Sequence, residues 1–246
     1  MAPSNLFIGT SGWTYPWRGI FYPEDLPSAD FLPFYARHFT TTEVNSSFYH
    51  FTMLKTIEKW RAQTPDTFRI AAKLHRSITH EHRLHDVEAP LRKWMDRFLT
   101  LGPRLGPILI QLPASFRFEA PRALAFFQLL RQLYPDPVFA LEVRHKSWLE
   151  EEPLDLLREF SISWVIAHSP RWPILETTTT DTIYLRLHGE QKLYSGPYSD
   201  DLLERFGYMI HDWLLDGRQV WVFFNNTIGG AAVHDATRLA SLLANL

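Results

Sequence analysis

The sequence contains no cysteine among its 246 residues. This absence excludes disulfides, iron–sulfur clusters, thiolate zinc sites and a cysteine nucleophile. No uninterrupted apolar stretch approaches the roughly 20 residues that a membrane-spanning helix needs. The first residues also lack the basic and apolar segments of a secretory signal. We therefore expect a cytoplasmic protein with no membrane contact.

Charge of one sign is also scarce, and so are nucleotide motifs. Lys and Arg number 25 and Asp and Glu number 27, for a net charge of −2. This balance gives no support for a broadly basic surface that binds nucleic acid, although it is compatible with a local basic groove. The chain has no nucleophile elbow, no Walker loop and no dinucleotide fingerprint between a strand and a helix.

Apolar strand-like and helix-like segments alternate along the whole chain. Strands are predicted over residues 6–13, 40–45, 68–74, 108–112, 163–168, 182–187 and 219–224, and at the start of 138–148. Helices are predicted over 28–38, 53–63, about 90–101, between Pro121 and Pro135, and over 153–160, 200–215 and 232–243. No helical pattern lies between His168 and Asp181. The alternation predicts one α/β domain over residues 1–246, a TIM-type (β/α)8 barrel with about seven outer helices.

Five of these strands become polar at their C-terminal ends. Side chains alternate between the two faces of a strand, so polar residues two positions apart share a face. In a parallel barrel the C-terminal ends of all strands meet at one mouth, where active sites occur. The residues concerned are Glu43 and Asn45, Lys73 and His75, Gln111, Glu142 and Arg144, and Arg186 and His188.

Six short motifs follow one another along the chain: Ile8-Gly-Thr-Ser-Gly-Trp13, Thr42-Glu-Val-Asn-Ser-Ser-Phe-Tyr49, Gln111-Leu-Pro113, Leu141-Glu-Val-Arg144, Tyr184-Leu-Arg-Leu-His-Gly189 and Phe224-Asn-Asn226. With these motifs the chain resembles, over almost its whole length, the domain-of-unknown-function 72 family, also called YecE-like proteins. The resemblance implies a TIM-type barrel and implies no particular reaction. The family pattern usually has Asn before the Ala of the last helix, where this chain has Asp235 before Ala236.

The carboxylates at the mouth are the first candidates for catalysis. Glu43 and Glu142 lie three strands apart, so we expect them to face each other across the mouth, with His188 beside them. Paired carboxylates serve as acid and base in glycoside hydrolysis. The alternative is that each is a structural salt-bridge partner, Glu142 of Lys73 or Arg186 for instance. We expect Glu142 to be ion-paired and ionised, and the pKa of Glu43 to be raised, since no charge adjoins it in sequence.

Cationic and amide side chains are the candidates for substrate binding. Lys73, Arg144 and Arg186, with Gln111, suit an anionic ligand because guanidinium groups match carboxylate and phosphate. The alternative is a self-neutralised network that rigidifies the barrel. After the last strand, glycines before a helix can expose backbone N–H groups to phosphate, and the alternative there is a plain tight turn. The residues of this segment are Asn225, Asn226, Gly229 and Gly230.

No metal and no cofactor are predicted. His168 and His188 could join the two glutamates as ligands, but Lys73 and Arg144 on neighbouring strand ends would repel a cation. The sequence thus favours an enzyme acting on an anionic small molecule, phosphorylated or sugar-like, by acid/base chemistry at the mouth. Two alternatives stay open: a nucleic-acid-binding or phosphodiester-processing protein, and a non-catalytic ligand-binding barrel.

Overall fold

Eight parallel strands follow the hydrogen-bonded order β1-β8-β7-β6-β5-β4-β3-β2 and curve into a barrel. In this computed structural model, which describes residues 4–246, the TIM-type fold is confirmed. The first three residues of the predicted domain lie outside the described residues. The strands are β1 (Leu6–Thr10), β2 (Thr41–Val44), β3 (Arg69–Lys73), β4 (Leu105–Gln111), β5 (Phe139–Glu142), β6 (Ser163–His168), β7 (Thr182–Leu187) and β8 (Gln219–Phe224).

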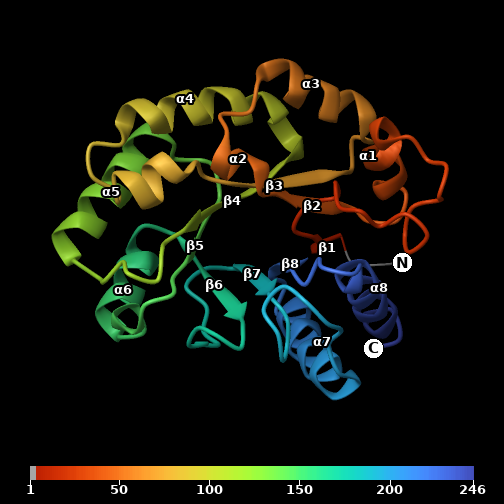
Figure 1. Cartoon of the computed structure of the whole chain (residues 1–246). Helices are drawn as coiled ribbons and strands as arrows, with labels where there is room; N and C mark the ends of the chain where they lie inside the picture. The colour runs from red at the N-terminus through yellow and green to blue at the C-terminus, as the bar shows by residue number, and fades with distance from the viewer. Residues whose placement is uncertain (1–3) are drawn as a thin grey trace.

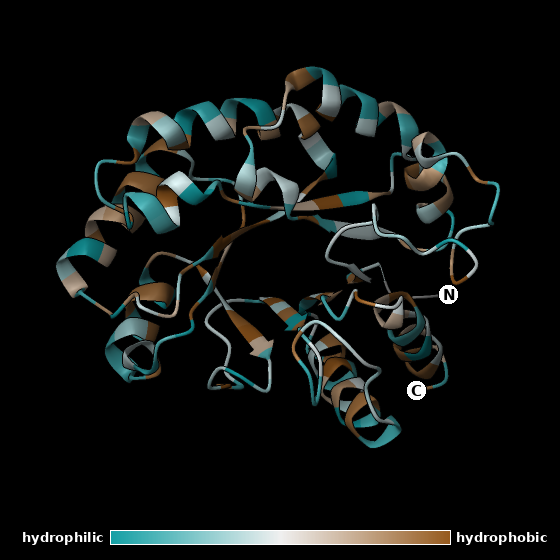
Figure 2. Ribbon diagram, viewed as in Figure 1, coloured by the Kyte–Doolittle hydropathy of each residue, from teal (hydrophilic) through white to brown (hydrophobic). Residues whose placement is uncertain are grey.

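Within the described part of the chain, seven helices surround the strands (Figure 1), one after each strand except β6. The segment between β6 and β7 is irregular, as predicted. A short extra helix, α2 (Ser46–Tyr49), follows β2 before α3. Figure 2 shows apolar residues on the strands and inner helix faces and polar residues outside. The outer helices are α1 (Phe31–Tyr35), α3 (Leu54–Gln63), α4 (Glu88–Phe98), α5 (Ala120–Leu133), α6 (Glu151–Glu159), α7 (Asp200–Leu215) and α8 (Ala231–Leu243).

The first outer helix is much shorter than the predicted 28–38. A 3-10 turn covers Ser28–Asp30, and the α-helix begins at Phe31 and ends at Tyr35. Pro33 accounts for the late start, because its ring would clash with the carbonyl of Ala29 if the α-helix began earlier. Pro33 is tolerated only in the first turn, where no intrahelical N–H partner is needed.

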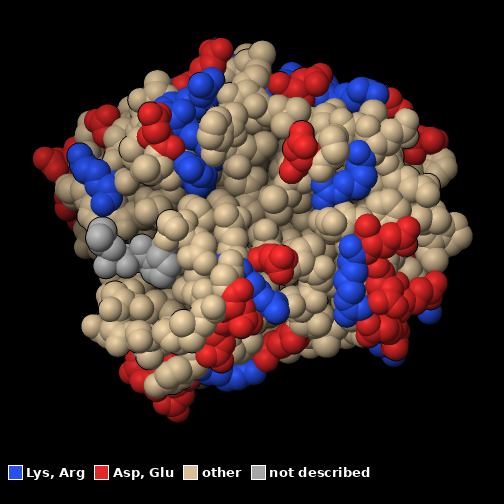
Figure 3. Space-filling model, turned by 180° about the vertical axis from the view of Figure 1, so that it is seen from behind, with Lys and Arg blue, Asp and Glu red and all other residues tan. Residues whose placement is uncertain are grey.

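Acidic and basic side chains are mixed on the molecular surface. On the face drawn in Figure 3 they neighbour each other around the periphery, without a broad area of positive charge. Among the described residues, no helix combines the length and the apolar character that crossing a bilayer requires.

The barrel interior beneath the mouth is filled by side chains of very unequal size. Phe7 of β1 and Trp221 of β8 stack with their ring centroids 4.0 Å apart. Gly106 of β4 leaves room for this indole, since a Cβ atom there would lie 2.9 Å from it. Tyr184 and Phe223 fill the next level, with centroids 5.2 Å apart. The interior is therefore a packed core, and polar side chains gather at its C-terminal end.

Strands β1 and β2 are the two ends of the hydrogen-bonded order, and a tyrosine hydroxyl joins them. The Tyr35 hydroxyl accepts a hydrogen bond from the Thr10 amide at 2.8 Å and donates one to the Thr41 carbonyl at 3.1 Å. The Thr42 hydroxyl donates to the Thr10 carbonyl at 3.1 Å. Gly9 permits this approach, because a Cβ atom there would lie 2.1 Å from the Thr41 carbonyl oxygen.

Replacing Tyr35 with Phe should lower the free energy of unfolding by about 1–3 kcal/mol, because it leaves a buried amide and a buried carbonyl without partners. Urea denaturation followed by tryptophan fluorescence measures this change. Tyr208→Phe is the matched control, since Tyr208 is 58% exposed. Equal stabilities for the two variants would contradict the role of Tyr35 in closing the barrel.

Candidate functional site

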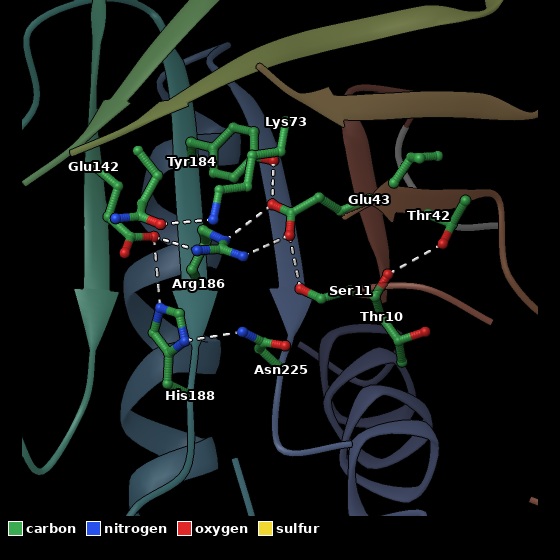
Figure 4. Close-up of polar contacts among 12 residues, drawn as sticks. Thr10, Ser11, Thr42, Glu43, Lys73, Glu142, Tyr184, Arg186, His188 and Asn225 are labelled. Atoms are coloured by element: carbon green, nitrogen blue, oxygen red, sulfur yellow. Dashed lines mark hydrogen bonds and ion pairs between the residues drawn. The ribbon is translucent and has the colours of Figure 1, made fainter. Parts of the chain in front are cut away.

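Arg186 lies between the two glutamates at the mouth of the barrel (Figure 4). Its Nε and Nη2 atoms donate to the two oxygens of Glu43 at 2.9 and 2.7 Å. Its Nη1 atom donates to Oε2 of Glu142. The predicted convergence of strand ends is thus present, because one guanidinium from β7 bridges carboxylates from β2 and β5.

Glu43 has four hydrogen-bond donors around its buried carboxylate. Besides Arg186, the Ser11 hydroxyl donates to Oε1 at 2.8 Å and the Tyr184 hydroxyl to Oε2 at 2.6 Å. Burial alone would raise the pKa of Glu43, but the charge of Arg186 and these hydrogen bonds outweigh it and lower the pKa. The expectation of a raised pKa is therefore wrong, because the deciding charge comes from across the barrel and not from the same strand.

Glu142 is buried and ion-paired with two arginines, as expected. Arg144 approaches its Oε1 atom at 2.8 Å, and Arg186 binds the other oxygen. Burial opposes ionisation, yet these two guanidinium groups hold the pKa of Glu142 well below its usual range. The partner from β7 is Arg186, one of the two that the sequence suggested.

His188 completes the buried network beside Glu142. Its Nε2 atom lies 3.5 Å from Oε2 of Glu142, and the Asn225 amide lies 3.0 Å from Nδ1. Because the Asn225 amide N–H donates to Nδ1, the proton of the neutral imidazole is on Nε2, on the side of Glu142. Burial lowers the pKa of His188, although Glu142 opposes the effect. His188 is therefore neutral near pH 7.

A cavity of about 570 Å³ opens above this network. Glu43, Glu142 and His188 have no exposed surface and lie beneath it. The cationic and amide groups on its lining include Lys73, Gln111, Arg144, Arg186 and Asn225. A ligand in the cavity would meet these groups before it reached either carboxylate.

Lys73 is the mouth cation that has no carboxylate partner among residues 4–246. Its Nζ atom donates to Oε1 of Gln111 at 2.6 Å and lies 4.0 Å from the centroid of the Phe48 ring. Burial, the nearby charge of Arg186 and, to a lesser extent, that of Arg144 lower the pKa of Lys73 to about 7, although Glu142 acts the other way. Its ammonium and amine forms are therefore both populated at neutral pH.

Aromatic side chains form much of the remaining lining, and none of them was among the residues predicted for the site. The Arg144 guanidinium lies 3.7 Å above the ring centroid of Trp172, which belongs to the irregular segment between β6 and β7. His80, whose pKa burial and neighbouring cations lower to about 4, lines the cavity as a neutral ring. The motif Thr42–Tyr49, which ends in Phe48 and Tyr49, was the sequence feature that could have predicted an aromatic lining. The aromatic lining residues are Tyr15, Phe48, Tyr49 and Tyr194.

The segment after β8 contributes only in part to the cavity. Asn225 lines it, whereas the Asn226 amide donates to the Gly196 carbonyl and to Asp235, each at 2.8 Å, inside the protein. Gly229 and Gly230 have φ angles of 72° and 78° and do not line the cavity. At Gly230 a Cβ atom would lie 2.6 Å from the Ile20 side chain. These φ angles are those of a plain tight turn, which was the alternative to a phosphate-binding segment.

Asp235, the departure from the family pattern, is a buried carboxylate with structural partners. It accepts the Tyr198 amide at 3.0 Å and the Arg238 guanidinium at 2.8 Å, besides Asn226. Among the described residues, no three His, Asp or Glu side chains gather as a metal ion would require.

Curated proteins of similar sequence cover the chain to different extents. The UPF0759 protein YunF of Bacillus subtilis is 24% identical over an alignment of 269 positions, which covers 97% of this chain and 94% of that protein. The UPF0759 protein YecE of Escherichia coli O157:H7 is 31% identical over an alignment of 173 positions, which covers 67% of this chain and 59% of that protein.

Solved structures of similar fold cover almost the whole chain. A DUF72 family protein from Thermotoga maritima aligns with a TM-score of 0.87 and 28% identity, over 97% of this chain and 99% of that one. A DUF72 family protein from Enterococcus faecalis aligns with a TM-score of 0.85 at 20% identity, over 98% and 96%, and shows the fold alone. The family model described as "Protein of unknown function DUF72" matches residues 7–246, and the chain therefore belongs to the DUF72 family.

Proposed function

We propose that the mouth cavity binds an anionic small molecule and that the protein is an enzyme acting on it by proton transfer. The observation that carries this proposal is the charge balance of the mouth. Glu43 and Glu142 are neutralised inside the barrel by Arg186 and Arg144. Lys73 faces the cavity without a carboxylate partner among the described residues. An incoming anion would therefore gain an ion pair that the protein itself does not supply.

The lining suggests what kind of anion fits. Arg144 and Arg186 offer guanidinium groups, which match the geometry of carboxylate and phosphate. Aromatic rings such as Tyr15, Phe48 and Tyr194 would cover an apolar or sugar-like body. We therefore favour a phosphorylated or carboxylated substrate small enough for about 570 Å³, and we propose the cytoplasm as the place where the protein meets it.

Lys73 is the group that we propose as the proton carrier. A pKa of about 7 populates the acid and the base forms together, the condition under which a general acid or base is most effective. Glu43, Glu142 and His188 are fully buried. We propose that these three position Arg186 and the cavity floor and do not touch the substrate.

Anion binding should be accompanied by proton uptake. A bound anion stabilises the ammonium form of Lys73 and so raises its pKa above about 7. Isothermal titration with phosphate, sulfate and citrate, slightly above that pH and in two buffers of different ionisation enthalpy, measures affinity and proton uptake together. The absence of a binding heat for every anion would overturn the proposal.

Arg144→Gln should weaken anion binding by about tenfold, the loss expected for one charge-assisted hydrogen bond. Arg92→Gln is the matched control, because Arg92 is an exposed arginine on α4. Equal affinities in the two variants would remove Arg144 from the binding site.

The rival interpretation is a protein that binds nucleic acid or processes phosphodiesters. The stack of Arg144 on Trp172 is the observation in its favour, since aromatic rings beside arginine can stack bases. Titration with single-stranded oligonucleotides at increasing salt distinguishes the two. A steep loss of affinity with salt would favour the rival, whereas binding of small anions alone would favour the small-molecule enzyme.

A further inference from the structure

Lys73 differs from every other lysine of the chain in its surroundings. It lines the mouth cavity and is half-buried. The other lysines are all exposed, namely Lys55, Lys59, Lys93, Lys146 and Lys192. We propose that Lys73 forms a covalent imine with the carbonyl carbon of an anionic aldehyde or ketone bound in this cavity. This inference rests on the proposed function, because the anionic group of the substrate is what holds the carbonyl near Nζ.

The backbone and the neighbours of Lys73 fix the direction of its amino group. Lys73 is the last residue of β3, and its own carbonyl accepts the Ser47 hydroxyl at 2.7 Å. An N–H of Nζ donates to Oε1 of Gln111 at 2.6 Å, and Nζ lies above the Phe48 ring. A neutral amine held in this way keeps its lone pair for an electrophile in the cavity, because its hydrogen bond to Gln111 uses an N–H and not the lone pair.

The surrounding charges serve two purposes. Arg144 and Arg186 disfavour a third positive charge at Lys73, which keeps a reactive fraction of free amine at neutral pH. The same guanidinium groups attract a carboxylate or phosphate on the substrate. A substrate that carries both an anionic group and a carbonyl group would therefore satisfy the arginines and present its carbonyl to the amine.

The reaction needs no oxidant or reductant. The Nζ lone pair forms a bond to the carbonyl carbon while the π pair of the C=O bond moves to oxygen. The oxygen takes up protons and leaves as water, and the nitrogen lone pair then forms the C=N bond. In total, one amine, one carbonyl and one proton give a protonated imine and one water. The protonated imine withdraws electrons from the adjacent carbon, so it would assist the removal of a proton there.

Reductive trapping tests the inference in the full chain. The protein is incubated with glyoxylate or pyruvate together with sodium cyanoborohydride, and the modified lysines are identified by peptide mass spectrometry. We expect Lys73 to be labelled at least about tenfold faster than any exposed lysine, since only a neutral amine attacks a carbonyl. Labelling of the exposed lysines at the rate of Lys73, or faster, would overturn the inference.

Two comparisons sharpen the test. Glyoxylate should label Lys73 faster than acetaldehyde, which has no anionic group, and Arg144→Gln should reduce this preference. Lys73→Met should abolish the fast labelling, whereas the matched control Lys59→Met should keep it; thermal melting shows whether both are folded.

If phosphate binds the wild-type protein but Lys73 is not labelled, the covalent step is overturned and the anion site stands. If Lys73 is not labelled and none of phosphate, sulfate and citrate binds, both are overturned.

Discussion

Replacing Arg186 with methionine is expected to lower the free energy of unfolding at neutral pH by about 3–5 kcal/mol, the cost of leaving a buried charge without its partner. Arg186 is the common partner of Glu43 and Glu142, and all three side chains are buried. Without the guanidinium, Glu43 keeps only hydroxyl partners, those of Ser11 and Tyr184. No other single polar side chain of the site holds two fully buried carboxylates.

The same variant should reverse the pH dependence of stability. In the wild-type protein the pKa values of Glu43 and Glu142 are lowered from the ordinary 4.5, so their contribution to stability is present above that value and is lost as the pH falls. Without Arg186, burial raises the pKa of Glu43 above 4.5, and the folded state then binds protons more tightly than the unfolded state. The variant should therefore gain stability as the pH falls from neutral toward 4.5.

Urea denaturation at a series of pH values measures both effects. Arg92→Met is the control, because it removes an exposed arginine from α4 without touching the barrel. A triple variant, Arg186→Met with Glu43→Gln and Glu142→Gln, should recover part of the loss because no buried charge is left unpaired. An Arg186→Met protein as stable as the Arg92→Met protein would contradict the bridging role.

Glu43→Gln is expected to lower the free energy of unfolding by about 3 kcal/mol, near the lower end of the cost of breaking a buried ion pair. The neutral amide puts an NH2 group among donors from Arg186, Ser11 and Tyr184, where only acceptors are useful. The sequence alone indicated a catalytic acid or base at Glu43, and loss of such a group would leave the melting temperature nearly unchanged.

Calorimetric melting of Glu43→Gln beside Glu58→Gln, an exposed glutamate of α3, separates these expectations. A melting temperature equal to that of the Glu58 variant, together with lost turnover, would restore Glu43 as a direct catalyst. A lowered melting temperature would support its assignment as a positioning residue.

The spacing of apolar residues predicted the barrel scaffold well, because the buried face of each strand and helix requires apolar side chains at regular positions in the local sequence. The strands β6, β7 and β8 begin and end at the predicted residues, and the segment after β6 has no helix. Charges at the ends of apolar strands were sufficient to place Glu43, Glu142 and Arg186 at one mouth, since strand direction and alternation fix where such residues lie.

Contacts across the barrel could not be predicted, because they depend on which strands face each other and on how far side chains reach. The pKa of Glu43 follows from Arg186, 143 positions away along the chain. Trp172 lies in a segment without periodicity, so nothing in its neighbourhood linked it to Arg144. The closing role of Tyr35 likewise follows from its hydroxyl and not from the apolar pattern of its helix.

The pairing of β1 with β8 also sets the order of events on the ribosome. The Asn5 amide donates to the Arg218 carbonyl, 213 residues further along the chain, and β1 pairs through its full length with β8. At about 5–20 residues per second, synthesis needs roughly 10–40 s to supply that partner. During this interval the first strand made has no ladder partner, so the barrel can close only once the last strand has left the exit tunnel.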